Sequence, residues 1–162
     1  MGSAPKQWVN RVEKGIGTGF GLGFAPVASG TVGTLGAIPL AFILWKVSIP
    51  IRLLLLLSIV AVAVWASDGY QKGCDRPDPS EVVIDEVAGY LVTVLFLPST
   101  WLSVAVGFFW FRTFDIVKPF PVDRMERFSG GFGIVMDDVV AGLYAWALSG
   151  FTLRLWEWWL KA

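Results

Sequence analysis

Residues 111–142 read FRTFDIVKPFPVDRMERFSGGFGIVMDDVVAG, and in this stretch an almost unbroken apolar sequence becomes polar and charged. Arg112, Asp115 and Lys118 follow one another at three-residue steps, a spacing that places their side chains on one side of a helix end. The two prolines that come next predict that this helix stops there. The three residues could form part of a functional site. The same spacing would also suit a ladder of ion pairs on a protein surface, and the sequence leaves both interpretations open.

A pair of carboxylates, Asp137 and Asp138, follows the glycine-rich turn at 129–131 and begins the next apolar segment. Carboxylates beside so much apolar sequence cost free energy unless a cation or a hydrogen-bonding partner compensates them. We therefore expect this pair to lie opposite Arg112 and Lys118, where the four side chains would hold a metal ion and a phosphate group.

The composition is more hydrophobic and less charged than that of ordinary globular proteins, as in membrane proteins. Of the 162 residues, 55% are hydrophobic and 16% are charged, and the mean hydropathy is +0.63. The length predicts a single domain over residues 1–162. A net charge of zero gives a nucleic-acid partner no electrostatic support. With no histidine and one cysteine, the sequence excludes intrachain disulfides, cysteine clusters and histidine-based nucleophiles or zinc sites.

The apolar residues fall into five segments, each bounded by prolines or charges: 35–45, 51–67, 82–97, 101–114 and 139–153. These runs are shorter than the roughly 20 residues of a membrane-crossing helix, but their polar ends bring most of them close to that length. The pattern predicts an all-α fold, a compact helical bundle with about five apolar helices in or at the membrane. A soluble bundle of buried helices is the alternative.

Both ends of the chain suit a membrane surface. We expect a Trp-rich interfacial tail in residues 154–162. Residues 1–14 predict either a short interfacial helix or an ordinary surface helix. If the five segments cross back and forth, the side that holds the N-terminus receives all acidic residues but Glu157. It also receives all but four of the 13 Lys and Arg residues, the exceptions being Lys46, Arg52, Arg154 and Lys161. The positive-inside rule makes that side cytoplasmic, with the active site at the cytoplasmic helix ends.

The glycine-rich stretch at 15–36 precedes the first apolar segment and implies tight turns or close backbone approach. Ser29, Gly30 and Thr31 stand where that segment begins. A Ser or Thr cap with open N–H groups at a helix N-terminus is a natural phosphate site, so we expect Gly30 and Thr31 to bind the substrate. A glycine-rich segment for helix packing is the alternative.

A second acidic stretch lies at 78–89, DPSEVVIDEVAG. Asp78, Pro79 and Glu81 predict the start of a helix, with a cap, a proline and an acidic first turn. Asp85 and Glu86 lie further along, within an apolar face, and carboxylates there require a cation, a partner or a function.

Oxygen ligands without His or Cys indicate Mg²⁺ or a similar hard ion. The predicted metal ligands are Asp85, Glu86, Asp137 and Asp138. Lys118 and Arg112 would neutralise phosphate oxygens. A cysteine phosphatase needs C-x5-R, and Ser80 stands where that Arg would follow Cys74. Haloacid-type phosphatases need a DxD motif near the N-terminus, and phosphohistidine phosphatases need histidines; this sequence has neither. The phosphatase chemistry that remains is metal-assisted attack on phosphorus.

The chain resembles the phosphatidylglycerophosphatase A family in three motifs that occur in the same order. These motifs are GFGLGFAPVASGTVGTLG, DPSEVVIDEVAG and the stretch from Phe111 to Tyr144. The resemblance implies an all-helical fold and Mg²⁺-dependent hydrolysis of phosphatidylglycerophosphate to phosphatidylglycerol at the bacterial cytoplasmic (inner) membrane. The family's motif positions correspond here to Asp85, Glu86, Arg112, Asp115, Lys118, Asp137 and Asp138. One departure is that the family commonly has Pro-Gly-Thr where this chain has Ser29-Gly30-Thr31.

We assign the catalytic work to Asp85, Glu86, Asp115, Lys118 and Asp138. Thr31, Arg112 and Lys118 would hold the terminal phosphate, while Asp115 or Glu86 would orient the attacking water. A transferase of phospholipid headgroups would need aspartates spaced along one helix, which the sequence lacks. The remaining alternative is a small membrane transporter for an ion or a phosphorylated metabolite, although its polar groups should lie near the bilayer midplane.

Overall fold

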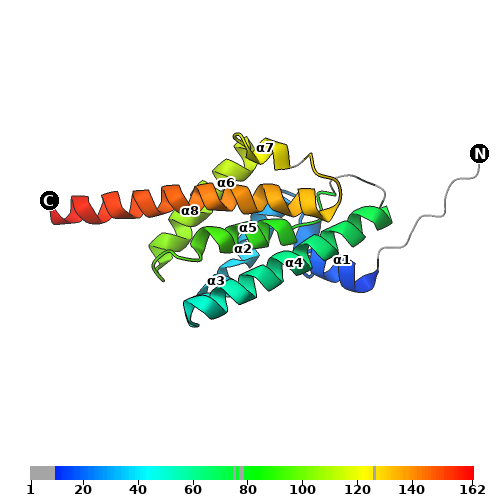
Figure 1. Cartoon of the computed structure of the whole chain (residues 1–162), viewed down its shortest axis with the longest axis horizontal. Coiled ribbons are helices and arrows are strands. Elements are labelled where there is room, and N and C mark those ends of the chain that lie inside the picture. Colours follow the sequence, from blue (N-terminus) through cyan, green and yellow to red (C-terminus); the bar gives the residue numbers. More distant parts are fainter. Residues whose placement is uncertain (1–9, 75, 77–78, 126) are drawn as a thin grey trace, which may run out of the picture.

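The computed structural model describes residues 10–74, 76, 79–125 and 127–162, and it is helical throughout with no strand in these ranges (Figure 1). The predicted all-α, compact fold is therefore confirmed. In chain order the elements are α1 (Arg11–Gly17), the 3-10 helix η1 (Leu22–Phe24), α2 (Ser29–Gly36), α3 (Ile38–Trp45), α4 (Ile49–Cys74), α5 (Ile84–Val94), α6 (Trp101–Val117), α7 (Val122–Met125) and α8 (Gly131–Lys161).

Helix α5 is the centre of the bundle and packs against α2, α4, α6 and α8 (Figure 1). Nine of its 11 residues are buried, including Tyr90, Leu91 and Val94. A helix that is apolar on nearly all sides is buried, either in the core of a protein or in a membrane. The two acidic residues of α5, Asp85 and Glu86, are in its first turn, at one end of the bundle.

The start of α5 differs from the prediction. The helix begins at Ile84, so the pattern at Pro79 and Glu81 does not start it, and Asp78 lies outside the described residues. Both carboxylate oxygens of Glu81 accept hydrogen bonds from Arg76 at 2.8 Å. Because Glu81 is engaged by a neighbouring arginine in a turn, it does not contribute to the first turn of a helix.

Helix α6 has the predicted end. It begins at Trp101 and is capped by Thr100, whose hydroxyl accepts a hydrogen bond from the Ser103 N–H at 3.1 Å. It stops at Val117, because Lys118 adopts a left-handed conformation (φ 45°) directly before Pro119. That change of direction turns the Lys118 side chain toward α8.

Helix α8 crosses α5 at a point where both helices carry glycine. A Cβ atom on Gly142 would collide with the carbonyl oxygen of Gly89, and one on Gly89 would lie 2.6 Å from the carbonyl oxygen of Asp138. At its start, the Gly131 N–H donates to Asp68 of α4 at 3.3 Å. The crossing and this bond fix the first turns of α8, which carry Asp137 and Asp138.

Two helices, α4 and α8, are long and apolar enough to cross a membrane, with 26 and 31 residues. On α4, large apolar side chains such as Leu54, Leu57 and Trp65 are exposed. The predicted tail at 154–162 is the last part of α8, which continues to Lys161 and projects beyond the other helices (Figure 1). Of the segment 1–14, residues 1–9 lie outside the described residues, and α1 begins at Arg11.

The bundle end where α4 begins and α5 ends is held by Arg52. Its guanidinium donates to the carbonyl oxygens of Trp45, Val47 and Leu95 at 2.8, 3.0 and 3.2 Å. The Trp45 indole also donates to the Val94 carbonyl at 3.0 Å. These bonds satisfy carbonyl groups at the C-terminal ends of α3 and α5 that have no partner within their own helices.

The α5–α8 crossing predicts that Gly142→Ala separates the two helices. We expect the free energy of unfolding to fall by about 1–3 kcal/mol, since the added methyl group overpacks the contact. The measurement is thermal unfolding in detergent. Gly150→Ala on the same helix is the matched control, because a Cβ atom there meets nothing within 4 Å. Equal stability of Gly142→Ala and wild type would contradict the close crossing.

Candidate active site

Six of the predicted site residues line one cavity of about 570 Å³: Asp85, Glu86, Asp115, Lys118, Asp137 and Asp138. Its walls come from the end of α4, the start of α2, the segment before α5, the first turn of α5, the end of α6, the segment before α8 and the start of α8. The predicted residues Gly30, Thr31 and Arg112 are not on this lining. The structure thus brings six of the predicted side chains together, and their roles remain predictions.

Three carboxylates form the deepest part of the site. Asp85 and Glu86 from α5 and Asp138 from α8 each place an oxygen within 4.8 Å of the others. Asp85 and Asp138 are 8% and 3% exposed. One oxygen on each of the three residues is buried without a hydrogen-bond partner in the described part of the chain. We call Asp85, Glu86 and Asp138 the carboxylate triad.

The triad fits a metal ion. Clustered, buried carboxylates with unsatisfied oxygens are the donor set that a hard divalent cation takes. A cation held by the triad would compensate the negative charge that this site otherwise concentrates away from water.

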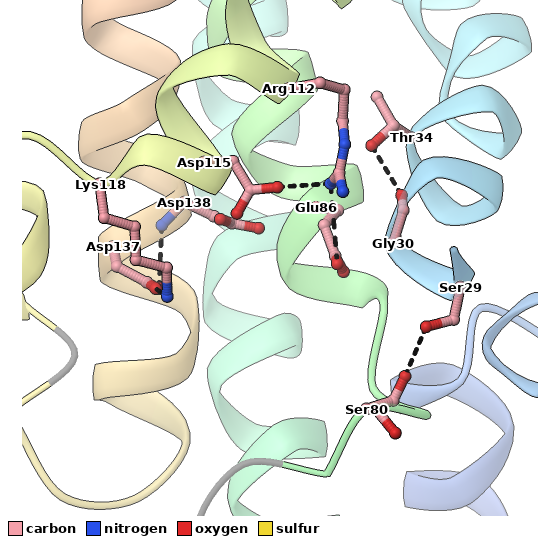
Figure 2. Close-up of polar contacts among 10 residues, drawn as sticks. All are labelled: Ser29, Gly30, Thr34, Ser80, Glu86, Arg112, Asp115, Lys118, Asp137 and Asp138. Atoms are coloured by element: carbon pink, nitrogen blue, oxygen red, sulfur yellow. Dashed lines mark hydrogen bonds and ion pairs between the residues drawn. The ribbon is translucent and has the colours of Figure 1, made fainter. Parts of the chain in front are cut away.

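Asp137 lies outside the triad. Its Oδ2 accepts a hydrogen bond from the Lys118 Nζ at 2.7 Å (Figure 2). Successive residues of a helix point about 100° apart, so Asp137 and Asp138 face different partners. The structure thus brings together three of the four predicted metal ligands and places the fourth against a lysine.

Arg112 links the end of α6 to the triad. Its guanidinium forms an ion pair with Asp115, and its Nη1 lies 3.9 Å from Glu86 Oε1 (Figure 2). The side chains of Arg112 and Asp115 are only 17% and 13% exposed, so this is not a ladder on the protein surface. Lys118 reaches α8, where it donates to Asp137.

The start of α2 packs directly on the site. A Cβ atom on Gly30 would collide with the Glu86 carboxylate and lie 3.1 Å from Arg112 Nη1, so a larger residue here would displace these two side chains. Ser29 is not a helix cap, since Ala28 takes that position without a side-chain bond. The Ser29 hydroxyl instead donates to the Ser80 carbonyl at 2.7 Å (Figure 2). Thr31 is not on the cavity lining.

Sequence reasoning did not select several polar residues that line the cavity: Gln71, Ser80, Arg127 and Ser129. Gln71 lies near the end of α4, and no local pattern marks it. Arg127 and Ser129 belong to the same polar stretch as the selected residues, and that stretch was the available signal.

A family model described as phosphatidylglycerophosphatase A matches residues 15–153. The chain belongs to the phosphatidylglycerophosphatase A family. The resemblance noted in the sequence is therefore confirmed, and membership makes the chain a phosphatase, a phosphoric monoester hydrolase. No solved structure gives a significant match.

Three relatives are similar over most of their length. Phosphatidylglycerophosphatase A of Escherichia coli is 32% identical over 143 residues, which cover 87% of this chain and 83% of the relative. The protein of the same name from Haemophilus influenzae is 31% identical over 145 residues, covering 87% and 88%. A Bacteroides thetaiotaomicron protein, provisionally named phosphatidylinositol-3-phosphatase, is 40% identical over 147 residues, covering 82% and 88%.

The triad predicts that a divalent cation stabilises the fold. At about 100 times its Kd, a ligand that binds only the folded state adds about 2.7 kcal/mol, which is several degrees in Tm for a chain of this size. We expect Asp85→Asn and Asp138→Asn to abolish the rise in Tm. Asp137→Asn should retain it, because that carboxylate faces Lys118.

The control is Glu157→Gln, which removes a carboxylate near the far end of α8. It should respond to the cation as wild type does. A rise in Tm that survives both triad substitutions would place the metal elsewhere in the protein.

Proposed function

We propose that the protein hydrolyses the phosphate monoester of phosphatidylglycerophosphate, giving phosphatidylglycerol and inorganic phosphate in phospholipid biosynthesis. The observation that carries this proposal is the carboxylate triad in one cavity with Lys118, with Arg112 beside Glu86, in a chain of this family. The names of the Escherichia coli and Haemophilus influenzae relatives support the substrate.

We propose Mg²⁺ as the metal, held by Asp85, Glu86 and Asp138. When bound, Mg²⁺ polarises phosphoryl oxygens and offsets their charge without any proton transfer. The unsatisfied carboxylate oxygens of the triad support this assignment, since Mg²⁺ prefers oxygen ligands. In this scheme Asp137, a predicted ligand, orients Lys118 instead.

The basic residues would stabilise the transition state. Lys118 and Arg112 are each held by a carboxylate, Asp137 and Asp115, so neither needs to reorganise when negative charge develops on the phosphoryl oxygens. Asp115 lines the cavity and is the residue that we propose to orient the attacking water, with Glu86 as the alternative.

The backbone at Gly30 and Thr31 is our proposed second contact for the phosphate. The close packing of Gly30 against Glu86 and Arg112 supports this placement, because it puts the first turn of an eight-residue helix beside the charged groups. N–H groups in a first helical turn favour anions.

A lipid substrate suits the surface beside the cavity. An apolar groove of about 450 Å³ lies between the end of α6 and the middle of α8, lined by Phe114, Pro119, Phe120, Tyr144, Ala147 and Leu148. Phe114 and Pro119 are the sequence neighbours of Asp115 and Lys118, which line the cavity. An acyl chain in this groove would therefore leave the headgroup beside the catalytic groups.

We further propose a multi-pass protein of the bacterial cytoplasmic membrane, with the cavity facing the cytoplasm. The long apolar helices α4 and α8 and the bacterial relatives support membrane residence. The excess of Lys and Arg at the cavity end supports the orientation. A transporter is less well supported, since the charged groups gather at helix ends in a phosphatase family.

The relative from Bacteroides thetaiotaomicron favours a second candidate substrate. Its name indicates a phosphatidylinositol 3-phosphate phosphatase, and its 40% identity makes that lipid worth equal testing. The chemistry at phosphorus would be the same for both lipids, because each carries a phosphate monoester on a polyol headgroup.

The proposed function predicts Mg²⁺-dependent phosphate release from phosphatidylglycerophosphate in mixed micelles and loss of release in EDTA. Phosphatidylinositol 3-phosphate and phosphatidic acid are assayed in parallel at matched acyl length. Preference for the inositol lipid would select the second candidate. Release that EDTA leaves unchanged would contradict the metal assignment.

The triad also predicts that Asp138→Asn lowers turnover by more than about 100-fold. The exchange is isosteric and removes only a buried charge, so Tm without added metal should stay within a few degrees of the wild-type value. Glu157→Gln again serves as the control, with turnover like that of wild type. An active Asp138→Asn enzyme would remove this residue from the mechanism.

A further inference from the structure

The cavity is larger and more varied than hydrolysis of a phosphate monoester requires. Besides the catalytic groups, its lining of about 570 Å³ includes the polar side chains of Ser29, Gln71, Ser80 and Ser129. Hydroxyl and amide groups are suited to bind the hydroxyl groups of a polyol. The lining also includes Arg127, which the mechanism above does not use.

Lys118 and Arg127 are the two basic residues on this lining within the described ranges, and their surroundings differ. The Lys118 side chain is 28% exposed and donates to the buried Asp137 at 2.7 Å. The Arg127 side chain is 74% exposed, and its Nη2 lies 3.7 Å from Oδ2 of Asp123. Exposed ion pairs of this kind contribute little, so an anionic ligand readily displaces them.

The position of Arg127 suits a second anionic group on the substrate. Arg127 lies in the segment between α7 and α8, whereas the triad is held by α5 and α8. The Arg127 side chain is exposed while Asp85 and Asp138 are buried, so an anion on Arg127 would lie nearer the solvent than a monoester at the triad and would be a different group. A planar guanidinium matches the oxygens of a phosphate diester, which carries one negative charge.

We propose that Arg127 binds the phosphodiester of the lipid and makes the enzyme selective for headgroups in which a polyol joins a phosphate monoester to a phosphodiester. The inference rests on the proposed function and specifies its substrate class. Phosphatidylglycerophosphate and phosphatidylinositol 3-phosphate share this chemistry. Phosphatidic acid lacks both the polyol and the phosphodiester.

The test compares wild type with Arg127→Ala on phosphatidylglycerophosphate and phosphatidic acid, matched in acyl chains and micelle composition. On the diester lipid we expect KM to rise about 10-fold to 100-fold with kcat unchanged, the scale of one lost hydrogen bond to a charged group. On phosphatidic acid kcat/KM should stay unchanged. Arg127→Lys should recover part of the lost affinity, because it restores the charge without the planar fork.

Arg124→Ala is the matched control. Arg124 belongs to the neighbouring helix α7, its guanidinium lies 4.6 Å from the Phe120 ring centroid, and it is not on the cavity lining. Any change in its kinetics should be equal on the two lipids, because the Phe120 ring lines the groove for the acyl chains that both lipids carry. If wild type prefers the inositol lipid, the same comparison is made with that lipid, which carries the same diester.

The outcomes separate the two proposals. If wild type is active and Arg127→Ala loses activity equally on both lipids, Arg127 acts on the monoester or on the fold. That result would overturn the inference and leave the proposed function standing. Unchanged kinetics in Arg127→Ala would also overturn it. Wild type that hydrolyses only phosphatidic acid, or none of the three lipids, would contradict the proposed function and the inference with it.

Discussion

The structure depends on the burial of Asp85, Glu86 and Asp138 against one another at the end of an apolar bundle. Like charges so close together, with little water, oppose folding unless their surroundings compensate them. Arg112, beside Glu86, supplies a compensating charge. Gly30 and the glycine crossing of α5 and α8 set how closely the helices around the carboxylates pack.

The broad architecture was predictable because it follows from composition and spacing. Apolar segments predicted helices, prolines predicted the end of α6, and charges clustered in sequence where the cavity forms. The errors arose where partners distant in sequence, or helix geometry, decide the outcome. Glu81 pairs with Arg76 instead of starting α5, and the Ser29 hydroxyl bonds to Ser80 instead of capping α2. Adjacency in sequence made Asp137 and Asp138 look like one unit, although the helix directs them apart.

The glycine-rich segment shows why two interpretations could not be separated in the sequence. Phosphate binding and helix packing were treated as alternatives, yet Gly30 packs α2 against Glu86 and Arg112, which belong to the site. Gly33, one turn later, would place a Cβ atom 2.7 Å from Val83, just before α5. The packing interpretation therefore holds at Gly30, and it places this segment beside Glu86 and Arg112, while phosphate binding there remains a proposal.

Because α8 is unbroken, it fixes the distance between the carboxylates near its start and the tryptophans near its end. Asp138 and Trp156 lie on one continuous helix, with Trp156 stacked on Trp159 near its end. The 18 residues from Asp138 to Trp156 span about 27 Å at a rise of about 1.5 Å per residue, close to the roughly 30 Å of a bilayer's hydrocarbon core. Aromatic rings that settle at one interface of a bilayer would therefore set the depth of the carboxylates at the other. The length of α8 would then determine the depth in the bilayer at which a lipid headgroup reaches the carboxylates.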